Sequence, residues 1–211
     1  VVAQELFKAG VDAITMGNHT WSKKDITSFI DDEPRIIRPA NYPPHLPGKG
    51  STIISGPCGN LGIANIIGRV FMDNTDCPFR AIEKEIEYLK NFTRVIIVDF
   101  HAEATSEKSA MAWYLDGRVS CVIGTHTHVQ TSDERILPCG TGFISDVGMT
   151  GPYDGILGVD RKLVIEKFLS GMPVRFEVAK GCVQFNAVEI EIDDRNGKTV
   201  RINRIRKIFD S

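Results

Sequence analysis

The most informative stretch of the chain is Arg94-Val95-Ile96-Ile97-Val98-Asp99-Phe100-His101. Its nearly continuous run of β-branched and apolar residues is typical of a strand buried on both faces, as in a parallel sheet covered by helices. Two further runs of this kind follow, at 119–123 and 142–146. Apolar spacing and capping residues predict helices at 81–91, 106–115 and 160–169. This alternation of strands and helices predicts an α/β protein.

The front and the tail of the chain follow other patterns. At the front we predict an uncapped helix ending at Gly10, a strand at 11–16, a helix from Ser22 to Ile30, and a hairpin of 52–54 with 61–67. In the tail, residues 174–178, 183–192 and 199–205 alternate apolar with polar side chains, which predicts an antiparallel meander. We therefore expect a four-layer α/β/β/α sandwich formed by residues 1–211 as a single domain. Residues 173–207 would complete its second sheet.

The composition is that of an ordinary globular protein, with 42% apolar and 25% charged residues in 211. The net charge of −2 gives no basic field that would attract nucleic acid or an anionic membrane. No apolar run approaches the roughly 18 residues needed to cross a bilayer. The five cysteines show no spacing typical of a zinc or redox motif, and reduced thiols suit a cytoplasmic protein.

Four of the five histidines follow directly after predicted strands: His19, His101, His126 and His128. In an α/β sheet, ligands bind outside the carboxyl ends of the strands, so these rings are expected at one edge. The i, i+2 spacing in Gly124-Thr125-His126-Thr127-His128 places two rings on one side of an extended segment. With the amide of Asn18, they form a donor set suited to a transition metal. His45 lies in a proline-rich loop and is assigned no role.

The reaction class follows from this donor set and from the motifs that the sequence lacks. The sequence contains no Walker A loop, no Gly-x-Gly-x-x-Gly and no Gly-x-Ser-x-Gly. A histidine-rich site favours metal-assisted hydrolysis, in which one or two ions hold a phosphoryl oxygen. His19 stands beside the ligand-type Asn18, which would place a proton donor near the leaving group. Gly17 and Gly124 are expected to allow tight turns that bring the ligands to one centre.

Three blocks carry a family resemblance: Gly17-Asn18-His19, Asp99-Phe100-His101 and Gly124-Thr125-His126-Thr127-His128. In this order they resemble the calcineurin-like metallophosphoesterases. The longer stretches that surround them are similar to the bacterial YmdB-like subgroup, at residues 13–21, 99–108, 122–131 and 146–155. The resemblance runs through essentially the whole chain.

The resemblance implies a phosphodiesterase with two metal ions, iron or manganese, that acts on cyclic nucleotides such as 2′,3′-cyclic AMP. By the same resemblance, one metal would be held by Asn18, His101 and His126. His128 would ligate the other metal, and His19 would be the proton donor. The ligand types also tolerate zinc or cobalt. Thr20 stands where the wider superfamily has Glu or Asp, but it matches the subgroup, and Asp146 either shapes the pocket or caps a turn.

The family's Gly-Asp-x-x-Gly and Gly-Glu-Asn motifs do not occur in the sequence. We expect the native gene product to carry them upstream and this chain alone to be inactive, because they would supply a terminal and a bridging carboxylate. The alternative is a non-catalytic protein of the same fold that senses metal or nucleotide. An amidohydrolase on a (β/α)₈ barrel is a third interpretation, but it expects His-x-His on the first strand. The predicted partner is a small phosphodiester, without membrane or nucleic acid, and a homo-oligomer is compatible with the sequence.

Overall fold

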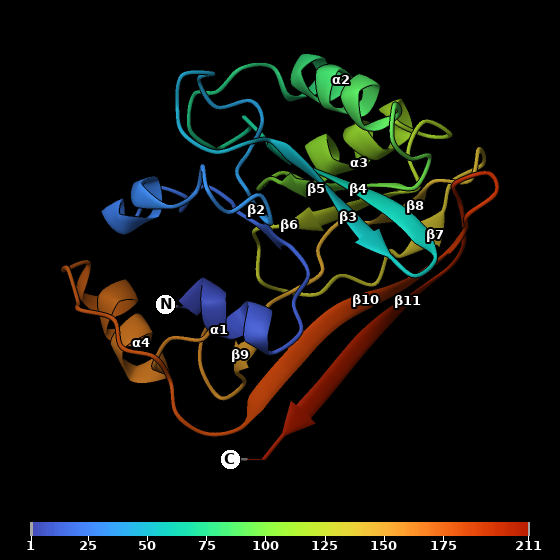
Figure 1. Ribbon diagram of the computed structural model, residues 1–211. Coiled ribbons are helices and arrows are strands. Elements are labelled where there is room, and N and C mark those ends of the chain that lie inside the picture. The colour runs from blue at the N-terminus through green and yellow to red at the C-terminus, as the bar shows by residue number, and fades with distance from the viewer. Residues whose placement is uncertain (1, 211) are drawn as a thin grey trace.

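The computed structural model describes residues 2–210, and its elements are shown in Figure 1. The α-helices are α1 (Val2–Lys8), α2 (Pro78–Leu89), α3 (Thr105–Tyr114) and α4 (Arg161–Ser170), and a short 3₁₀ helix covers Lys24–Ser28. The strands are β1 (Ile14–Thr15), β2 (Ile36–Ile37), β3 (Ser51–Gly56), β4 (Gly59–Ile67), β5 (Ile96–His101), β6 (Cys121–Thr125), β7 (Arg135–Ile136), β8 (Gly142–Ile144), β9 (Gly151–Pro152), β10 (Val183–Asp193) and β11 (Lys198–Phe209). None of the helices within residues 2–210 has the length and apolar character needed to cross a bilayer.

A six-stranded sheet in the order β3-β4-β5-β6-β8-β7 forms the centre of the fold. Its four inner strands are parallel, and β3 and β7 run antiparallel to them at the edges. Helices α2 and α3 lie together over one face (Figure 1). There, Ile82 and Met111 of the helices pack with Val98, Phe100 and Phe143 of the strands in the main core. The predicted buried strand at 94–100 is thereby confirmed as the middle of the sheet.

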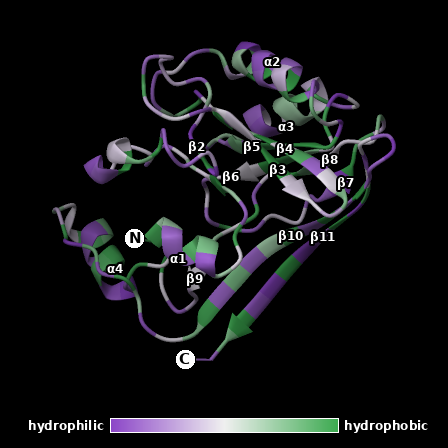
Figure 2. Ribbon diagram, in the orientation of Figure 1, coloured by the Kyte–Doolittle hydropathy of each residue, from purple (hydrophilic) through white to green (hydrophobic). Residues whose placement is uncertain are grey.

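The long hairpin of β10 and β11 covers the opposite face of this sheet. Val188, Ile190 and Ile202 of the hairpin pack against Cys121 and Ile144 of the central strands. Along β10 and β11 apolar residues alternate with polar ones, as Figure 2 shows. One face of the hairpin is therefore part of a second core, as the alternating pattern predicted.

The front of the chain forms a small unit beside the central sheet. Strands β1 and β2 pair in parallel as a separate two-stranded sheet. Ile14 of β1 packs with Ile26, Ile30 and Ile36, which form a third cluster of buried residues. The predicted strand 11–16 is thus confirmed only over Ile14–Thr15.

Two predicted elements are wrong. Instead of a helix from Ser22 to Ile30, the chain forms the 3₁₀ helix at Lys24–Ser28. Here the hydroxyls of Thr27 and Ser28 donate to carbonyls three residues earlier, which favours a tight turn over a regular helix. Residues 174–178 form only an isolated bridge between Val178 and Val159, and β9 takes the third place beside β10.

The remaining helices and strands predicted for the central part are confirmed, although their first and last residues differ from the prediction. The hairpin of 52–54 and 61–67 is β3–β4, and the helices at 81–91 and 106–115 are α2 and α3. Asp160 caps α4 by accepting a hydrogen bond from Lys162 N at 2.8 Å. The mixed α/β class is confirmed, whereas the four-layer sandwich stays a prediction.

The contact between hairpin and sheet can be tested at Ile202, which is 8% exposed. The Ile202→Ala variant should lower the free energy of unfolding by about 2–4 kcal/mol, because it leaves a cavity between two sheets. Urea unfolding followed by circular dichroism measures this change. Val200→Ala is the matched control on the same strand, since Val200 is 53% exposed, and it should stay within about 0.5 kcal/mol of the parent. Equal effects of the two substitutions would contradict the packing of the hairpin on the sheet.

Candidate metal centre

The small β1–β2 sheet carries Asn18 to the end of β5. Asn65, a fully buried residue of β4, donates from Nδ2 to Met16 O at 2.5 Å and so fastens the end of β1 to the central sheet. Gly17 then lies against the ring of His101, where a Cβ atom would come within 2.4 Å of Cε1. Glycine is needed here for close approach, and the predicted tight turn is also present, since Thr20 N donates to Gly17 O at 3.0 Å.

Three side chains from three strand ends converge on one point. The Oδ1 atom of Asn18 is 2.9 Å from Nε2 of His101, and Nδ1 of His126 is 3.1 Å from the same nitrogen. Ligand atoms bound to a metal at about 2.1 Å and at right angles would lie roughly 3.0 Å apart. The observed separations therefore suit donors to a single ion.

The outer nitrogens of both rings are engaged by other groups. Thr125 Oγ1 donates to Asp99 Oδ1 at 2.8 Å, so His101 Nδ1, 3.0 Å from this hydroxyl, must be the donor to it. His126 Nε2 lies 3.1 Å from Oε2 of Glu103. Each ring thus keeps its lone pair on the nitrogen that faces the other donors, which is how metal-ligating histidines are commonly oriented. Three acceptor atoms that meet in this way could hold a cation between them.

Burial keeps these imidazoles neutral. It lowers the pKa of His101 to about 4, with the nearby His126 adding to the effect. Burial also lowers the pKa of His126. For the buried carboxyl of Asp99 the same cause raises the pKa to about 6, so this group is still ionised at neutral pH and can accept from Thr125.

A buried ion pair anchors the loop that carries His126 and His128. Lys108 Nζ donates to Asp146 Oδ2 at 2.9 Å, and both side chains are only 2% exposed. The same oxygen accepts from the backbone N and the hydroxyl of Thr127, at 2.9 and 2.8 Å. Asp146 thus positions this loop, and it also caps a turn as considered from sequence, since its Oδ1 accepts from Gly148 N at 2.8 Å.

The anchoring of Thr127 matters because its neighbours are strained. His126 has φ 113° and His128 has φ 67°, values that non-glycine residues adopt at a cost of about 1–3 kcal/mol each. Gly124, just upstream, could not carry a side chain, because its Cβ would lie 1.8 Å from Ser145 O. The surrounding contacts therefore impose this loop conformation.

Two of the sequence-predicted residues lie outside the three-donor cluster. The ring of His128 forms no hydrogen bond within residues 2–210, and the residue lies two positions after His126 in the same loop. His19 is exposed, and its Nδ1 is 3.2 Å from Ser22 Oγ. Among residues 2–210, no three His, Cys, Asp or Glu side chains are grouped as a metal site, since the third member of this cluster is an amide.

Comparison with known proteins assigns the chain to a family. The family model described as "YmdB-like protein" matches residues 1–205 of the chain. The chain belongs to the YmdB-like family. This confirms the resemblance that the histidine blocks indicated.

Relatives of this YmdB-like chain include an enzyme and two solved structures. A Bacillus subtilis protein named 2′,3′-cyclic-nucleotide 2′-phosphodiesterase is 53% identical over 204 residues, which cover 97% of this chain and 77% of the relative. A structure from Thermus thermophilus, described as a hypothetical protein, has a TM-score of 0.90 and 40% identity and covers 99% and 80% of the two chains. A Mycoplasma pneumoniae structure described as a novel phosphatase has a TM-score of 0.89 and 37% identity, covering 99% and 76%. The names of these relatives confirm the expectation of an enzyme.

Sequence reasoning missed four residues that support the YmdB-like site: Asn65, Glu103, Lys108 and Thr125. A signal was present for Asn65, since it is a lone polar residue within the apolar run 61–67. Lys108 gave no such signal, because its partner is 38 residues away along the chain.

Removing one member of the buried ion pair should be costly. We expect Lys108→Met to lower the free energy of unfolding by about 3–5 kcal/mol, because Asp146 is left buried without its counter-charge. The double variant Lys108→Met with Asp146→Asn should recover part of this loss, since no uncompensated charge remains. Chemical denaturation measures both. The exposed Lys84→Met serves as control and should change stability by no more than about 0.5 kcal/mol.

The pKa shifts at Asp99 and His101 predict opposing contributions to stability in the metal-free protein. The pKa of Asp99 rises from 3.8 to about 6 on folding, so over this range the folded state keeps a proton and stability falls as pH rises. The pKa of His101 falls from 6.5 to about 4, so between these values the unfolded state binds the proton and stability rises with pH. Each contributes a slope of up to about 1.4 kcal/mol per pH unit.

Asp99→Asn should therefore make the stability of the metal-free protein rise more steeply between about pH 4 and 6, since only the histidine contribution remains. Urea unfolding at pH 4, 5 and 6 gives the slope. Asp32→Asn is the control, because Asp32 is exposed and its carboxylate forms no hydrogen bond within residues 2–210. An unchanged slope in Asp99→Asn would show that this carboxyl does not titrate as its burial implies.

Proposed function

We propose that this chain is part of a metal-dependent phosphodiesterase that hydrolyses the cyclic phosphate of 2′,3′-cyclic nucleotides through a two-metal site. The convergence of Asn18 Oδ1, His101 Nε2 and His126 Nδ1 within 2.9–3.1 Å carries the proposal. The name of the Bacillus subtilis relative supports the substrate class. We further propose that residues 1–211 act as one domain with the four-layer sandwich of the superfamily.

The donor chemistry fits a transition metal. Two imidazoles and an amide oxygen would hold one ion, and His128 would ligate the second. Iron or manganese are the proposed metals, and zinc or cobalt would also suit these ligands. Bound ions of this kind polarise a phosphoryl oxygen and offset the negative charge that develops during hydrolysis.

The chain's own residues have separate tasks in this proposal. Asp99 and Thr125 fix the ring of His101, and Glu103 fixes that of His126, so the ligand atoms need no reorganisation when substrate arrives. In the hydrolysis, the oxygen of water bonds to phosphorus, one bond from phosphorus to a ribose oxygen breaks, and that oxygen needs a proton.

His19 is the proposed source of this proton. It is exposed and directly follows the proposed ligand Asn18, while Ser22 Oγ lies 3.2 Å from Nδ1 of its ring. The Nε2 atom, which has no hydrogen-bond partner within residues 2–210, is left to hold the proton for the leaving oxygen.

The test uses the full-length gene product, stripped of metal and reloaded with manganese or iron. It should hydrolyse bis-p-nitrophenyl phosphate and 2′,3′-cyclic AMP. His19→Ala should lower kcat by about 10²–10⁴ without changing metal content, because a proton donor is lost and the ligands are kept. His126→Ala should lower metal content as well as activity.

His45→Ala is the matched control, since His45 is an exposed histidine in a separate loop. It should leave both metal content and turnover unchanged. Metal binding without turnover of either substrate would overturn the proposed activity and favour a sensing role. Unaltered turnover in His19→Ala would remove the proton-donor assignment.

A further inference from the structure

A cavity of about 270 Å³ adjoins the candidate metal centre and has no role in the proposed hydrolysis. His128 forms part of its wall, together with the loop at 149–158 and the inner face of the β10–β11 hairpin. The side chains that give it chemical character are Arg204, Arg206, Asn186 and Tyr153. Because His128 is a proposed ligand of the second metal, a substrate bound at the metals would extend into this space.

The charge of the wall is positive. Arg204 and Arg206 both line the cavity, and none of the described residues that line it is Asp or Glu. Nε of Arg204 donates to Oε1 of Glu134 at 2.7 Å. This contact leaves the two terminal nitrogens of Arg204 for another acceptor. Arg206 forms no ion pair within residues 2–210, and its guanidinium lies 5.7 Å from the centre of the Tyr153 ring. Guanidinium groups held in this way match the geometry of phosphate oxygens.

The two arginines are fixed relative to His128 by a short covalent and hydrogen-bonded path. Gln130, two residues after His128, donates from Nε2 to the carbonyls of Ala187 and Ile205, at 3.0 and 3.2 Å. Ile205 stands between the two arginines in β11. The hairpin therefore cannot shift without also moving the loop of the metal centre.

A buried polar atom in the wall lacks a partner. Asn186 is 9% exposed, and its Nδ2 donates to Met149 O at 2.8 Å. This contact fixes the amide, whose Oδ1 has no hydrogen-bond partner within the described part of the chain. An unpaired buried acceptor is costly, so a donor group on a ligand would relieve it.

We propose that this cavity receives the nucleoside side of the substrate and that Arg204 and Arg206 recognise a second phosphate on it. The inference rests on the proposed function and adds a substrate preference to it. The preferred substrate would be a 2′,3′-cyclic nucleotide that also carries a 5′-phosphate, over plain 2′,3′-cyclic AMP. The size of the cavity, close to the lower limit of about 300 Å³ for small-molecule sites, suits one nucleoside unit.

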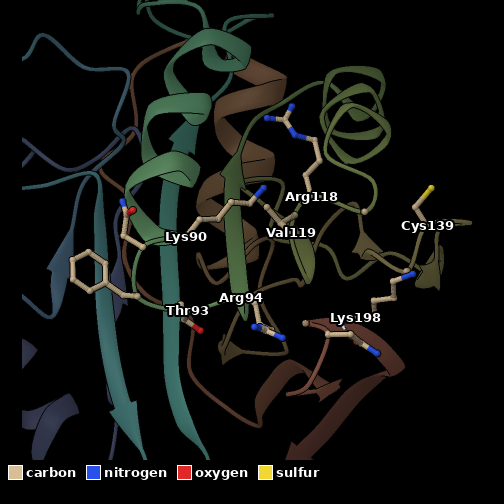
Figure 3. A pocket seen from close by; sticks show the side chains of 13 residues that line it. Lys90, Thr93, Arg94, Arg118, Val119, Cys139 and Lys198 are labelled. Carbon is tan, nitrogen blue, oxygen red and sulfur yellow. Dashed lines mark hydrogen bonds between the residues drawn. The ribbon is translucent and has the colours of Figure 1, made fainter.

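A second basic cavity provides an internal comparison. It lies at the other end of the central strands and is lined by Lys90, Arg94, Arg118 and Lys198 (Figure 3). Arg118 is already engaged by Glu83 in a bidentate ion pair. This cavity shares the positive charge of the first but not its nearness to the histidines.

The first experiment compares kcat/KM for 2′,3′-cyclic AMP and its 5′-phosphorylated form with the metal-loaded full-length protein. The parent should favour the 5′-phosphorylated substrate by about tenfold, the effect of one charge-assisted hydrogen bond. Arg206→Ala should abolish this preference by lowering kcat/KM for the 5′-phosphorylated substrate about tenfold more than for plain 2′,3′-cyclic AMP. Arg206 is exposed on a hairpin strand, so the variant is expected to fold. Lys198→Ala, in the comparison cavity, should keep the preference.

A second experiment measures binding of adenosine 5′-monophosphate and of adenosine to the metal-free protein by calorimetry. Arg206→Ala should weaken binding of the phosphorylated ligand by about tenfold and leave that of adenosine unchanged. Equal kcat/KM for both substrates in the parent, or equal losses in Arg206→Ala and Lys198→Ala, would overturn the inference. If no cyclic nucleotide is hydrolysed, the proposed function fails, and the binding measurement still decides whether the cavity takes a phosphate.

Discussion

The buried ion pair between Lys108 and Asp146 is the contact on which the arrangement of the candidate centre depends. Two charges at 2% exposure are expensive to bury, and the pair is tolerated because Asp146 also accepts from Thr127 and Gly148. These bonds reach the loop between the two strained histidines. A buried charge network therefore stabilises a backbone shape that the loop residues would not adopt by themselves.

The parallel register of the central sheet is a second constraint on the candidate centre, because it sets the orientation of the His101 ring. His101 pairs with Thr125 across β5 and β6, and Asp99 lies two residues before His101 on the same strand. Residues two apart in a strand point to the same side, so carboxyl, hydroxyl and imidazole form one line of hydrogen bonds. The orientation of the His101 ring is thus a consequence of how the strands pair. A slip of one residue in this register would move Thr125 away from both Asp99 and His101.

The sequence predicted the parts of the fold that are determined locally. The run at 94–100 could be recognised as a buried strand, and the histidines after strands could be placed at one edge. The segment 174–178 could not be judged in this way, because alternation indicates which side chains share a face but not whether a partner strand exists. Val178 is 76% exposed, as expected of a residue that belongs to no sheet. Lys108 was missed for a related reason, since a lysine on a helix usually faces solvent.

The proposed metal donors and the arginine cavity come from different parts of the chain. Asn18 and His126 come after strands β1 and β6 and His101 ends β5, whereas Arg204 and Arg206 belong to the hairpin. The hairpin is fastened to the metal loop by Gln130 through backbone carbonyls of β10 and β11, and these are present whatever side chains the hairpin carries. Side chains facing the cavity can therefore change without disturbing the position of the hairpin. This separation would allow the proposed metal chemistry to be combined with different preferences for the remainder of the substrate.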